Sequence, residues 1–305
     1  GITALGRVAF ARAGGRINND AIDNSGGVDC SDHEVNIKIL LNGVVDDGDL
    51  TVKQRNNLLA AMTDDVAAHV LANNDRQTQA LSLMRDRAPQ RLAEQGRFMR
   101  MLEREGRLER RVEQLPDDDS LAEREQQGSG LTRPELAIVL AYSKIRSYEQ
   151  LLDSPLVDGA EHLDDLLAYF PAPLRERYAE RIDQHPLRRE IIATGLANHV
   201  LNRMGATFLM RITEATGATL PEAVRAYITA RDLYGLRSLW HEIDALAGAV
   251  AAAEQQRLLH TLCELQERAT RWLLRQPQAA AGGDLPVARM QGAIEALDKA
   301  LPGLL

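Results

Sequence analysis

The residues best suited to chemistry lie in the segment 19–34, which reads NDAIDNSGGVDCSDHE. The pair Gly26-Gly27 lets the backbone adopt a positive φ or approach a ligand closely, and Ser31 follows near the expected first turn of a helix. Backbone N–H groups at such a turn bind anions. Taken by itself, however, the segment is more simply interpreted as a tight strand-to-helix turn capped by Asp and Ser, because such turns are common.

A metal site is the second chemistry that this segment suggests. Potential ligands crowd together at Asp29, Cys30, Asp32, His33 and Glu34. Consecutive residues cannot all point at one ion, and no complementary ligand pair is recognisable elsewhere. His241-Glu242 begins like the zinc motif H-E-x-x-H, but position 245 is Ala. We therefore predict no metal site.

Cysteine and tryptophan side chains each allow a functional and a structural interpretation. Cys30 stands beside Ser31 without a neighbouring general base, so a buried structural thiol is expected and not a nucleophile. Trp240 and Trp272 lie in helical stripes and are predicted to anchor the core.

The elements that must position these residues differ along the chain. The first 45 residues combine glycines, short apolar runs and turn formers, which favours a strand, a loop and the start of a helix. From Thr51 onward the pattern is helical, without the alternation of strands. Capping boxes, in which Ser/Thr is followed three residues later by Glu/Gln, mark helix starts at Thr51/Gln54, Thr132/Glu135 and Thr219/Glu222.

Polar segments divide the helical part. The stretch from Glu113 to Gly130 is predicted to connect helical subassemblies, and residues 76–112 form an amphipathic, charge-rich helical arm. Near the end, Gln276 to Asp284 has the composition of a linker, and a last short helix is expected around Val287 to Ala300.

Composition limits the class of protein. The 305 residues are 45% hydrophobic and carry a net charge of −8, with basic residues interspersed among acidic ones, which argues against nucleic acid as a partner. Apolar stretches fall short of the roughly 20 residues that span a bilayer, so no membrane partner is expected. Two distant cysteines and no signal-peptide pattern favour a cytoplasmic location.

The segment also resembles a known family pattern. Glutamate dehydrogenases, and related amino-acid dehydrogenases more loosely, carry P-D-x-x-x-N-A-G-G-V-x-x-S-x-x-E near the end of their dinucleotide-binding domain. Matching spacings occur at Asp20, Asn24, Gly26, Gly27, Val28, Ser31 and Glu34. The departures are Asn19 in place of Pro and Ser25 in place of Ala.

Several segments resemble one class of glutamate dehydrogenases, the large bacterial NAD-dependent class. Residues 23–38, DNSGGVDCSDHEVNIK, resemble it in particular. Further segments that resemble the same class are GLTRPELA at 130–137, AYSKI at 141–145, HPLRREIIAT at 185–194, NRMG at 202–205 and LRSLW at 236–240. The resemblance covers the chain up to about Leu274.

The resemblance implies a role for each residue of the motif. Ser31 would donate a hydrogen bond to the side-chain carboxylate of L-glutamate, Val28 would pack on its methylenes, and the Gly27 backbone would line the substrate site. Asn24 and Gly26 would contact the cofactor NAD. The implied reaction is oxidative deamination of glutamate to 2-oxoglutarate and ammonia, with hydride transfer to NAD.

The implied protein is longer than this chain. The chain opens at Gly1 in what reads as the middle of a domain, contains no G-x-G-x-x-G turn, and has no lysine in the family's catalytic context, so we expect a fragment without catalytic residues that is inactive alone. The expected fold is mostly α, with a short α/β remnant of a Rossmann-type NAD-binding domain before a large all-α domain. The expected partners are the rest of the same polypeptide and other subunits of a homo-oligomer.

The predicted organisation has three parts. Residues 1–45 end the NAD-binding catalytic domain, residues 46–130 form the helical arm and connection, and residues 131–305 form the C-terminal helical domain. The alternative from a different class is a free-standing helical interaction or regulatory module.

Overall fold

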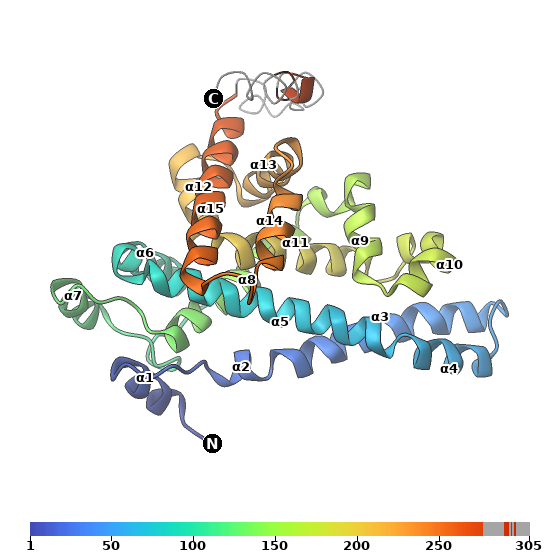
Figure 1. Cartoon of the computed structure of the whole chain (residues 1–305), viewed down its shortest axis with the longest axis horizontal. Coiled ribbons are helices and arrows are strands. Elements are labelled where there is room, and N and C mark those ends of the chain that lie inside the picture. The colour runs from blue at the N-terminus through green and yellow to red at the C-terminus, as the bar shows by residue number, and fades with distance from the viewer. Residues whose placement is uncertain (277–289, 293, 295, 297–305) are drawn as a thin grey trace. The chain divides into compact units, whose positions relative to one another are not determined.

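The computed structural model describes residues 1–276, 290–292, 294 and 296, and within these residues it contains helices and no β-strand. Two compact units divide the chain, at 1–207 and 208–305. The helices of the first unit are α1 (Ala4–Arg12), α2 (Asp20–Asp23), α3 (Ser25–Asp46), α4 (Val52–Ala61), α5 (Thr63–Asp86), α6 (Ala88–Arg104), α7 (Asp118–Gln126), α8 (Arg133–Leu152), the 3-10 helices η1 (Pro155–Asp158) and η2 (Ala160–His162), α9 (Leu163–Tyr169), α10 (Ala172–Asp183) and α11 (Arg188–Met204) (Figure 1).

The mostly α prediction is confirmed, but the strand expected in the first 45 residues is wrong, and the Rossmann-type remnant is not supported. In its place lie α1, α2 and the long α3. Thr3 caps α1 by accepting a hydrogen bond from the Gly6 N–H at 3.1 Å. Residues 4–12, ALGRVAFAR, are rich in Ala, Leu and Arg and contain a single β-branched residue, so their helix propensity outweighs the short apolar pattern.

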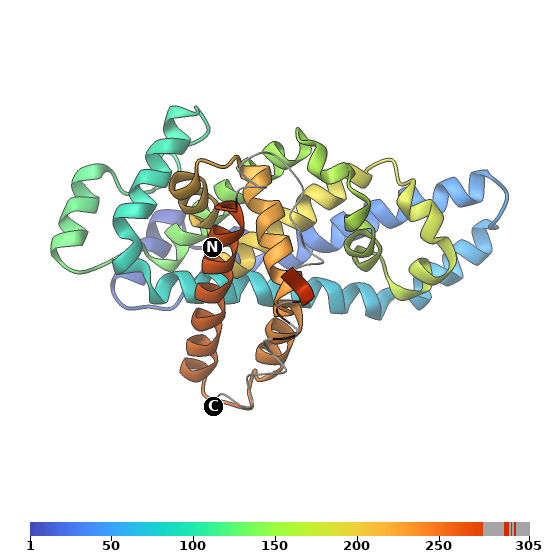
Figure 2. The same ribbon diagram turned by 90° about the horizontal axis from the view of Figure 1, so that it is seen from above.

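Helix α3 packs beside α5; the chain reverses direction at residues 47–51, and α4 then leads into α5 (Figures 1 and 2). Apolar residues at helical spacing face inward on α3, at Ile37, Leu40, Leu41 and Val44. The capping box at Thr51 is confirmed, because the Thr51 N–H donates to Gln54 Oε1 at 2.9 Å and the Gln54 N–H donates to Thr51 Oγ1 at 3.3 Å.

The pairing of α8 with α11 forms the middle of the first unit, with α5 packed on both helices. The capping box at the start of α8 is confirmed and buried, since Glu135 is 1% exposed and accepts from the Thr132 N–H at 2.6 Å. Arg124 donates to both carboxylate oxygens of Glu135 at 2.8 Å. This bidentate pair ties α7 to the first turn of α8.

The predicted connection between Glu113 and Gly130 is only partly a loop, because it contains the nine-residue helix α7. The Asp117 side chain accepts from the Ser120 N–H at 2.9 Å, and Asp118 and Asp119 occupy the first turn. Acidic side chains are favourable there because the N-terminus of a helix carries partial positive charge. The acidic run that suggested a loop is therefore a helix start.

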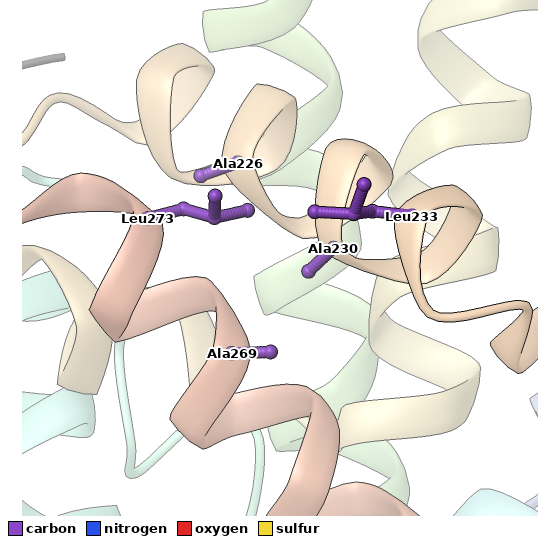
Figure 3. Close-up of a cluster of buried hydrophobic side chains, with 5 residues drawn as sticks. All are labelled: Ala226, Ala230, Leu233, Ala269 and Leu273. Atoms are coloured by element: carbon purple, nitrogen blue, oxygen red, sulfur yellow. The ribbon is translucent and has the colours of Figure 1, made fainter. Parts of the chain in front are cut away.

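The second unit contains α12 (Phe208–Thr216), α13 (Leu220–Leu233), α14 (Leu236–Ala245) and α15 (Ala252–Leu274). Its capping box at Thr219 is confirmed, with the Thr219 N–H donating to Glu222 Oε2 at 2.7 Å. Small residues let α13 and α15 approach closely, in a cluster formed by Ala226, Ala230, Leu233, Ala269 and Leu273 (Figure 3).

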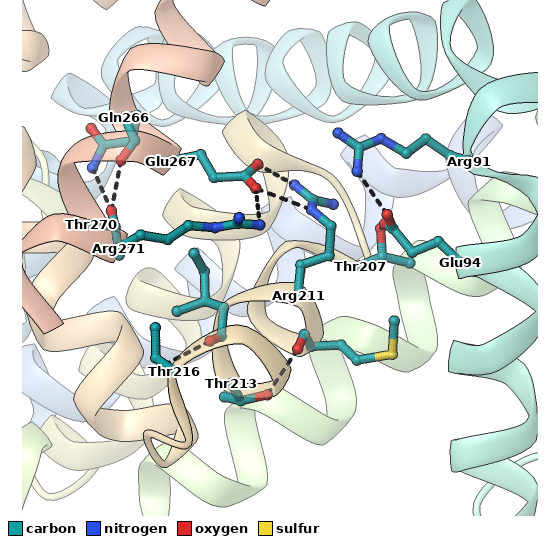
Figure 4. A network of polar contacts seen from close by, with 12 residues as sticks. Arg91, Glu94, Thr207, Arg211, Thr213, Thr216, Gln266, Glu267, Thr270 and Arg271 are labelled. Carbon is teal, nitrogen blue, oxygen red and sulfur yellow. Dashed lines mark hydrogen bonds and ion pairs between the residues drawn. The ribbon is translucent and has the colours of Figure 1, made fainter. Parts of the chain in front are cut away.

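A polar network joins α12 to α15 within the second unit. Arg211 donates to both oxygens of Glu267, at 2.6 and 3.4 Å, and Arg271 donates to one of them at 2.6 Å (Figure 4). Next to it, the buried Gln266 amide donates to the Tyr227 carbonyl at 2.9 Å. These contacts fix the register of α15 against its neighbours.

Two predictions for the second unit have different outcomes. Trp240 is buried as expected, whereas Trp272 is 47% exposed, so its assignment to the core is wrong. The predicted linker from Gln276 and most of the helix expected at Val287 to Ala300 lie outside the described residues. No helix in the described part of the chain has the length and apolarity needed to cross a membrane.

Candidate functional site

The glycine-rich motif forms the junction of α2 and α3. Asn19 caps α2 through a 3.0 Å hydrogen bond from the Ile22 N–H, and Asn24 ends α2 and begins α3. Gly26 and Gly27 lie in the first turn of α3 with negative φ, so the expected strand-to-helix turn is a helix-to-helix junction. Helix α3 begins at Ser25, and Ser31 therefore lies in its second turn.

Close packing explains the second glycine. A Cβ atom added at Gly27 would lie 2.7 Å from Asn24 Oδ1, so any side chain there would displace the Asn24 amide. Asn24 makes no side-chain cap hydrogen bond to α3, although asparagine is a preferred cap. The amide thus lies against Gly27 at the exposed start of the helix.

Four of the five predicted site residues share one exposed face of α3. Asn24, Gly27, Val28 and Ser31 follow helical spacing, and Val28 is 66% exposed. Ser31 Oγ donates to the Gly27 carbonyl at 3.2 Å. Val35, one turn further along, is also exposed and extends the face. We call residues 24, 27, 28, 31 and 35 the open face of α3.

Gly26 is the exception among the predicted site residues. It is half-buried, and a Cβ at this position would lie 3.6 Å from Val70 Cγ1 of α5. The structure therefore places Gly26 on the side of the helix that packs against α5.

Arginine side chains hold the junction that leads into α3. Arg7 of α1 donates to the Asn18 carbonyl at 2.8 Å and to Asp23 Oδ2 at 2.9 Å, and it also pairs with Asp20. Arg133 at the start of α8 binds the Asn18 side chain and donates to Ser82 Oγ at 2.8 Å. Asp20, a position of the family pattern, thus has a structural partner within this chain.

A polar cluster that the sequence did not predict holds α3 beside the open face. Tyr169, the last residue of α9, donates to Asp32 Oδ2 at 2.8 Å and accepts from Asn36 Nδ2 at 2.8 Å. Its ring stacks on His33 with a centroid distance of 4.4 Å. No sequence signal links Tyr169 to residues more than 130 positions earlier, although Asp32 and His33 had been considered as metal ligands.

Burial favours the neutral form of His33, whose ring lies at the centre of this cluster. Burial lowers the pKa of His33, the neighbouring Asp29 opposes this shift, and His69 adds to it. Neither ring nitrogen of His33 has a hydrogen-bond partner in the described structure, and Asp29 Oδ1 lies 4.0 Å from Nε2. Burial also raises the pKa of Tyr169, so its hydroxyl stays protonated and can donate to Asp32.

His185 adds a backbone contact to the same helix. Its Nε2 lies 3.1 Å from the Asn36 carbonyl, and its Nδ1 accepts from the Leu187 N–H at 3.0 Å. The second contact assigns the proton to Nε2, which then donates to the carbonyl. Burial lowers the pKa of His185 and favours this neutral form.

One lysine has a perturbed environment. Lys144 of α8 donates to Gln77 of α5, and burial lowers its pKa to about 8 although Asp29 opposes the shift. Gln77 and Asp29 both belong to the packed side of the α3–α5 pair, since Asp29 accepts from Asn73 of α5 at 2.9 Å. Lys144 therefore belongs to the packing of α8 against α5 and not to the open face.

Two other predictions for the motif concern the Cys30 thiol and a metal site. Cys30 is exposed, so the expected buried thiol is wrong. Within the described residues, no group of three or more His, Cys, Asp or Glu side chains is arranged to hold a metal ion.

Two family models match this chain. Residues 128–305, more than half of the chain, match the family described as glutamate dehydrogenase, C-terminal. Residues 1–84, which contain the open face, match the family described as bacterial NAD-glutamate dehydrogenase, catalytic domain. The chain belongs to the glutamate dehydrogenase family.

The relatives specify the branch of that family. A protein named NAD-specific glutamate dehydrogenase from Pseudomonas aeruginosa is 47% identical over 305 residues, which is all of this chain and 19% of the relative. A protein of the same name from Halomonas elongata is 44% identical over 90% of this chain, and one from Mycobacterium tuberculosis is 42% identical over 93% of it. In both cases the match covers 17% of the relative's own length. The chain spans less than a fifth of the length of these relatives.

Proposed function

We propose that the full-length protein is an NAD-dependent glutamate dehydrogenase, to which this chain contributes one wall of the substrate site and a helical scaffold. The observation that carries the proposal is the open face of α3. Asn24, Gly27, Val28 and Ser31 match the family pattern and lie together, exposed, on one helix face. An exposed face that combines valine with a hydroxyl donor suits a substrate with methylenes and a carboxylate.

Each residue then has a positioning role. Ser31 donates to the side-chain carboxylate of L-glutamate, Val28 packs on the methylenes, and the Gly27 backbone lines the floor between substrate and cofactor. A buried carboxylate needs charge-assisted hydrogen bonds in place of water, which a serine hydroxyl supplies. The Asn24 amide, which makes no cap bond to α3, contacts NAD.

The open face requires a second wall. None of its residues carries a positive charge, and Lys38 nearby pairs with Glu34. The cations that neutralise the carboxylates of glutamate must therefore come from the rest of the polypeptide. That part also supplies the catalytic lysine and aspartate and the phosphate-binding glycine turn. When bound, NAD would supply the acceptor for the hydride from the α-carbon of glutamate, and water would replace the amino nitrogen, so that the products are 2-oxoglutarate and ammonia.

We assign three parts of the chain to different parts of the proposed enzyme. Residues 1–45 close the catalytic domain through α1, α2 and most of α3. Residues 46–130 form the helical arm and connection, and residues 131–305 form a C-terminal helical domain that supports the cleft and contacts other subunits of a homo-oligomer. We place the enzyme in the cytoplasm and assign it no nucleic-acid partner.

The decisive experiment measures NAD reduction by L-glutamate at 340 nm, for the full-length protein and for residues 1–305 side by side. We expect turnover only in the full-length protein, because the chain alone lacks the catalytic lysine, the aspartate and the glycine turn. Turnover in neither sample would overturn the proposal and leave a helical interaction module. Turnover by residues 1–305 alone would contradict the assignment of catalysis to the rest of the polypeptide.

A further inference from the structure

Helix α3 has a weak start. Its first three residues are Ser-Gly-Gly, and glycine is the poorest helix former after proline. The preceding Asn24 provides no side-chain cap. The first turns of α3, which carry Val28 and Ser31, therefore depend on contacts with other helices for their position.

Helix α5 supplies those contacts on one side. Asn73 donates to Asp29 Oδ2 at 2.9 Å, and Asn74 donates to Ser25 Oγ. Both bonds lie before Ser31 in the sequence. They fix the first turn of α3 and the start of the second, at Ser25 and Asp29.

Helix α9 supplies the contact beside Ser31. Asp32, which accepts from the Tyr169 hydroxyl, is adjacent to Ser31 in sequence and follows Val28 by one helical turn. Asn36, one turn beyond Asp32, donates to the same hydroxyl. One oxygen atom thus bridges two successive turns of α3 and sets the rotation of the helix about its axis.

The bridge joins the two regions that match different families. Helix α3 lies in the stretch matched to the catalytic domain, residues 1–84, and Tyr169 lies in the stretch matched to the C-terminal family, residues 128–305. We propose that Tyr169 is a positioning residue for glutamate binding, which holds the open face of α3 in register through Asp32 and Asn36. This inference rests on the proposed function.

The central test is Tyr169→Phe in the full-length protein. The substitution removes the bridging oxygen and keeps the ring that stacks on His33. We expect the KM for glutamate to rise about three- to tenfold, the equivalent of one lost hydrogen bond, while the KM for NAD changes less than about twofold. Hydrogen exchange of the backbone amides of residues 28–36, measured without substrate, should accelerate.

Tyr142→Phe is the matched control. Tyr142 donates to Glu113 Oε1 at 2.7 Å, so this variant also loses a tyrosine–carboxylate bond, but away from α3. We expect its KM values and the exchange of residues 28–36 to equal those of the unmodified protein. An equal rise in KM in both variants would overturn the assignment to Tyr169.

Changes at Asp32 separate the bridge from general destabilisation. Asp32→Asn keeps an acceptor oxygen for the Tyr169 hydroxyl, so its KM for glutamate should stay close to that of the unmodified protein. Asp32→Ala should raise the KM for glutamate as Tyr169→Phe does. The double variant Tyr169→Phe/Asp32→Ala should be no worse than Tyr169→Phe alone, because loss of the hydroxyl already removes the contact with Asp32.

The outcomes distinguish the two proposals. Faster exchange in α3 with an unchanged KM for glutamate would make Tyr169 structural only and overturn the inference. Absence of glutamate-dependent NAD reduction in the unmodified protein would overturn the proposed function and this inference with it, while the exchange data would still report whether the bridge holds α3.

Discussion

At the scale of single residues, Ser31 has the freedom that a ligand-binding hydroxyl needs. It is exposed, and its hydrogen bond goes to the Gly27 carbonyl of its own helix. Among the described residues, no other helix is held in place by this side chain. A change at Ser31 should therefore affect binding without affecting folding.

The first prediction concerns Ser31→Ala in the full-length protein. The KM for glutamate should rise roughly 10- to 150-fold, because a hydrogen bond to a charged group contributes about 1.5 to 3 kcal/mol. The KM for NAD should change little, and stability should stay within about 0.5 kcal/mol. Steady-state kinetics and thermal unfolding measure these quantities.

Ser238→Ala is the control for that prediction. Ser238 is also an exposed helix serine, and its hydroxyl donates to the Gly235 carbonyl at 2.8 Å. This variant should leave both KM values unchanged. A glutamate KM that Ser31→Ala does not alter would remove Ser31 from the substrate site.

At the scale of elements, identical capping boxes have different surroundings. Glu135 is buried and also binds Arg124 through both oxygens, whereas the box at Thr219 and Glu222 is exposed. The bond from Thr219 lowers the pKa of Glu222, as expected of a working cap. One local motif thus serves as a simple helix start in one place and as a link between α7 and α8 in the other.

The second prediction compares Glu135→Ala with Glu222→Ala in residues 1–305. Loss of the exposed cap at Glu222 should cost about 1 kcal/mol. Loss of Glu135 should cost about 3 to 5 kcal/mol, because Arg124 then stays buried without its carboxylate. Urea unfolding followed by circular dichroism measures both. Equal costs would show that Arg124 finds water or another partner in the variant.

At the scale of the whole molecule, buried histidines connect stability to pH. His33, His162 and His185 are each almost fully buried, and burial is the main cause that lowers the pKa of each. The folded chain thus disfavours their protonated forms. The unfolded chain binds these protons more readily, so stability is fully present above the ordinary pKa of 6.5 and is lost as pH falls below it.

The third prediction uses His33→Phe. Asp29, Asp32 and His69 surround His33, and its ring nitrogens make no hydrogen bond in the described structure. Phenylalanine keeps the stack on Tyr169 and cannot be protonated. We expect the Tm of residues 1–305 to fall between pH 6.5 and about pH 5, and to fall less in this variant.

His241→Gln is the control for the pH measurement. His241 is exposed, so this variant should keep the pH dependence of the unmodified chain. If His33→Phe leaves the slope of Tm against pH unchanged, His33 does not contribute to the acid sensitivity.

Local sequence determined much of this protein. Capping boxes and helical spacing involve residues three or four positions apart, so the starts of α4, α8 and α13 were predictable. The family motif was equally readable, because its residues lie within one continuous segment. The clustering of Asn24, Gly27, Val28 and Ser31 on one face follows from the helical repeat once the segment is known to be helical.

Tertiary structure decided the rest, because these features depend on residues far apart in the chain. Packing against α5 and α8 stabilises helices in residues 1–45 where a strand was expected. Neighbouring helices decide that Gly26 turns inward, and that Cys30 and Trp272 are exposed. The contact of Tyr169 with Asp32 joins residues 137 positions apart, a pairing that only the fold can bring about.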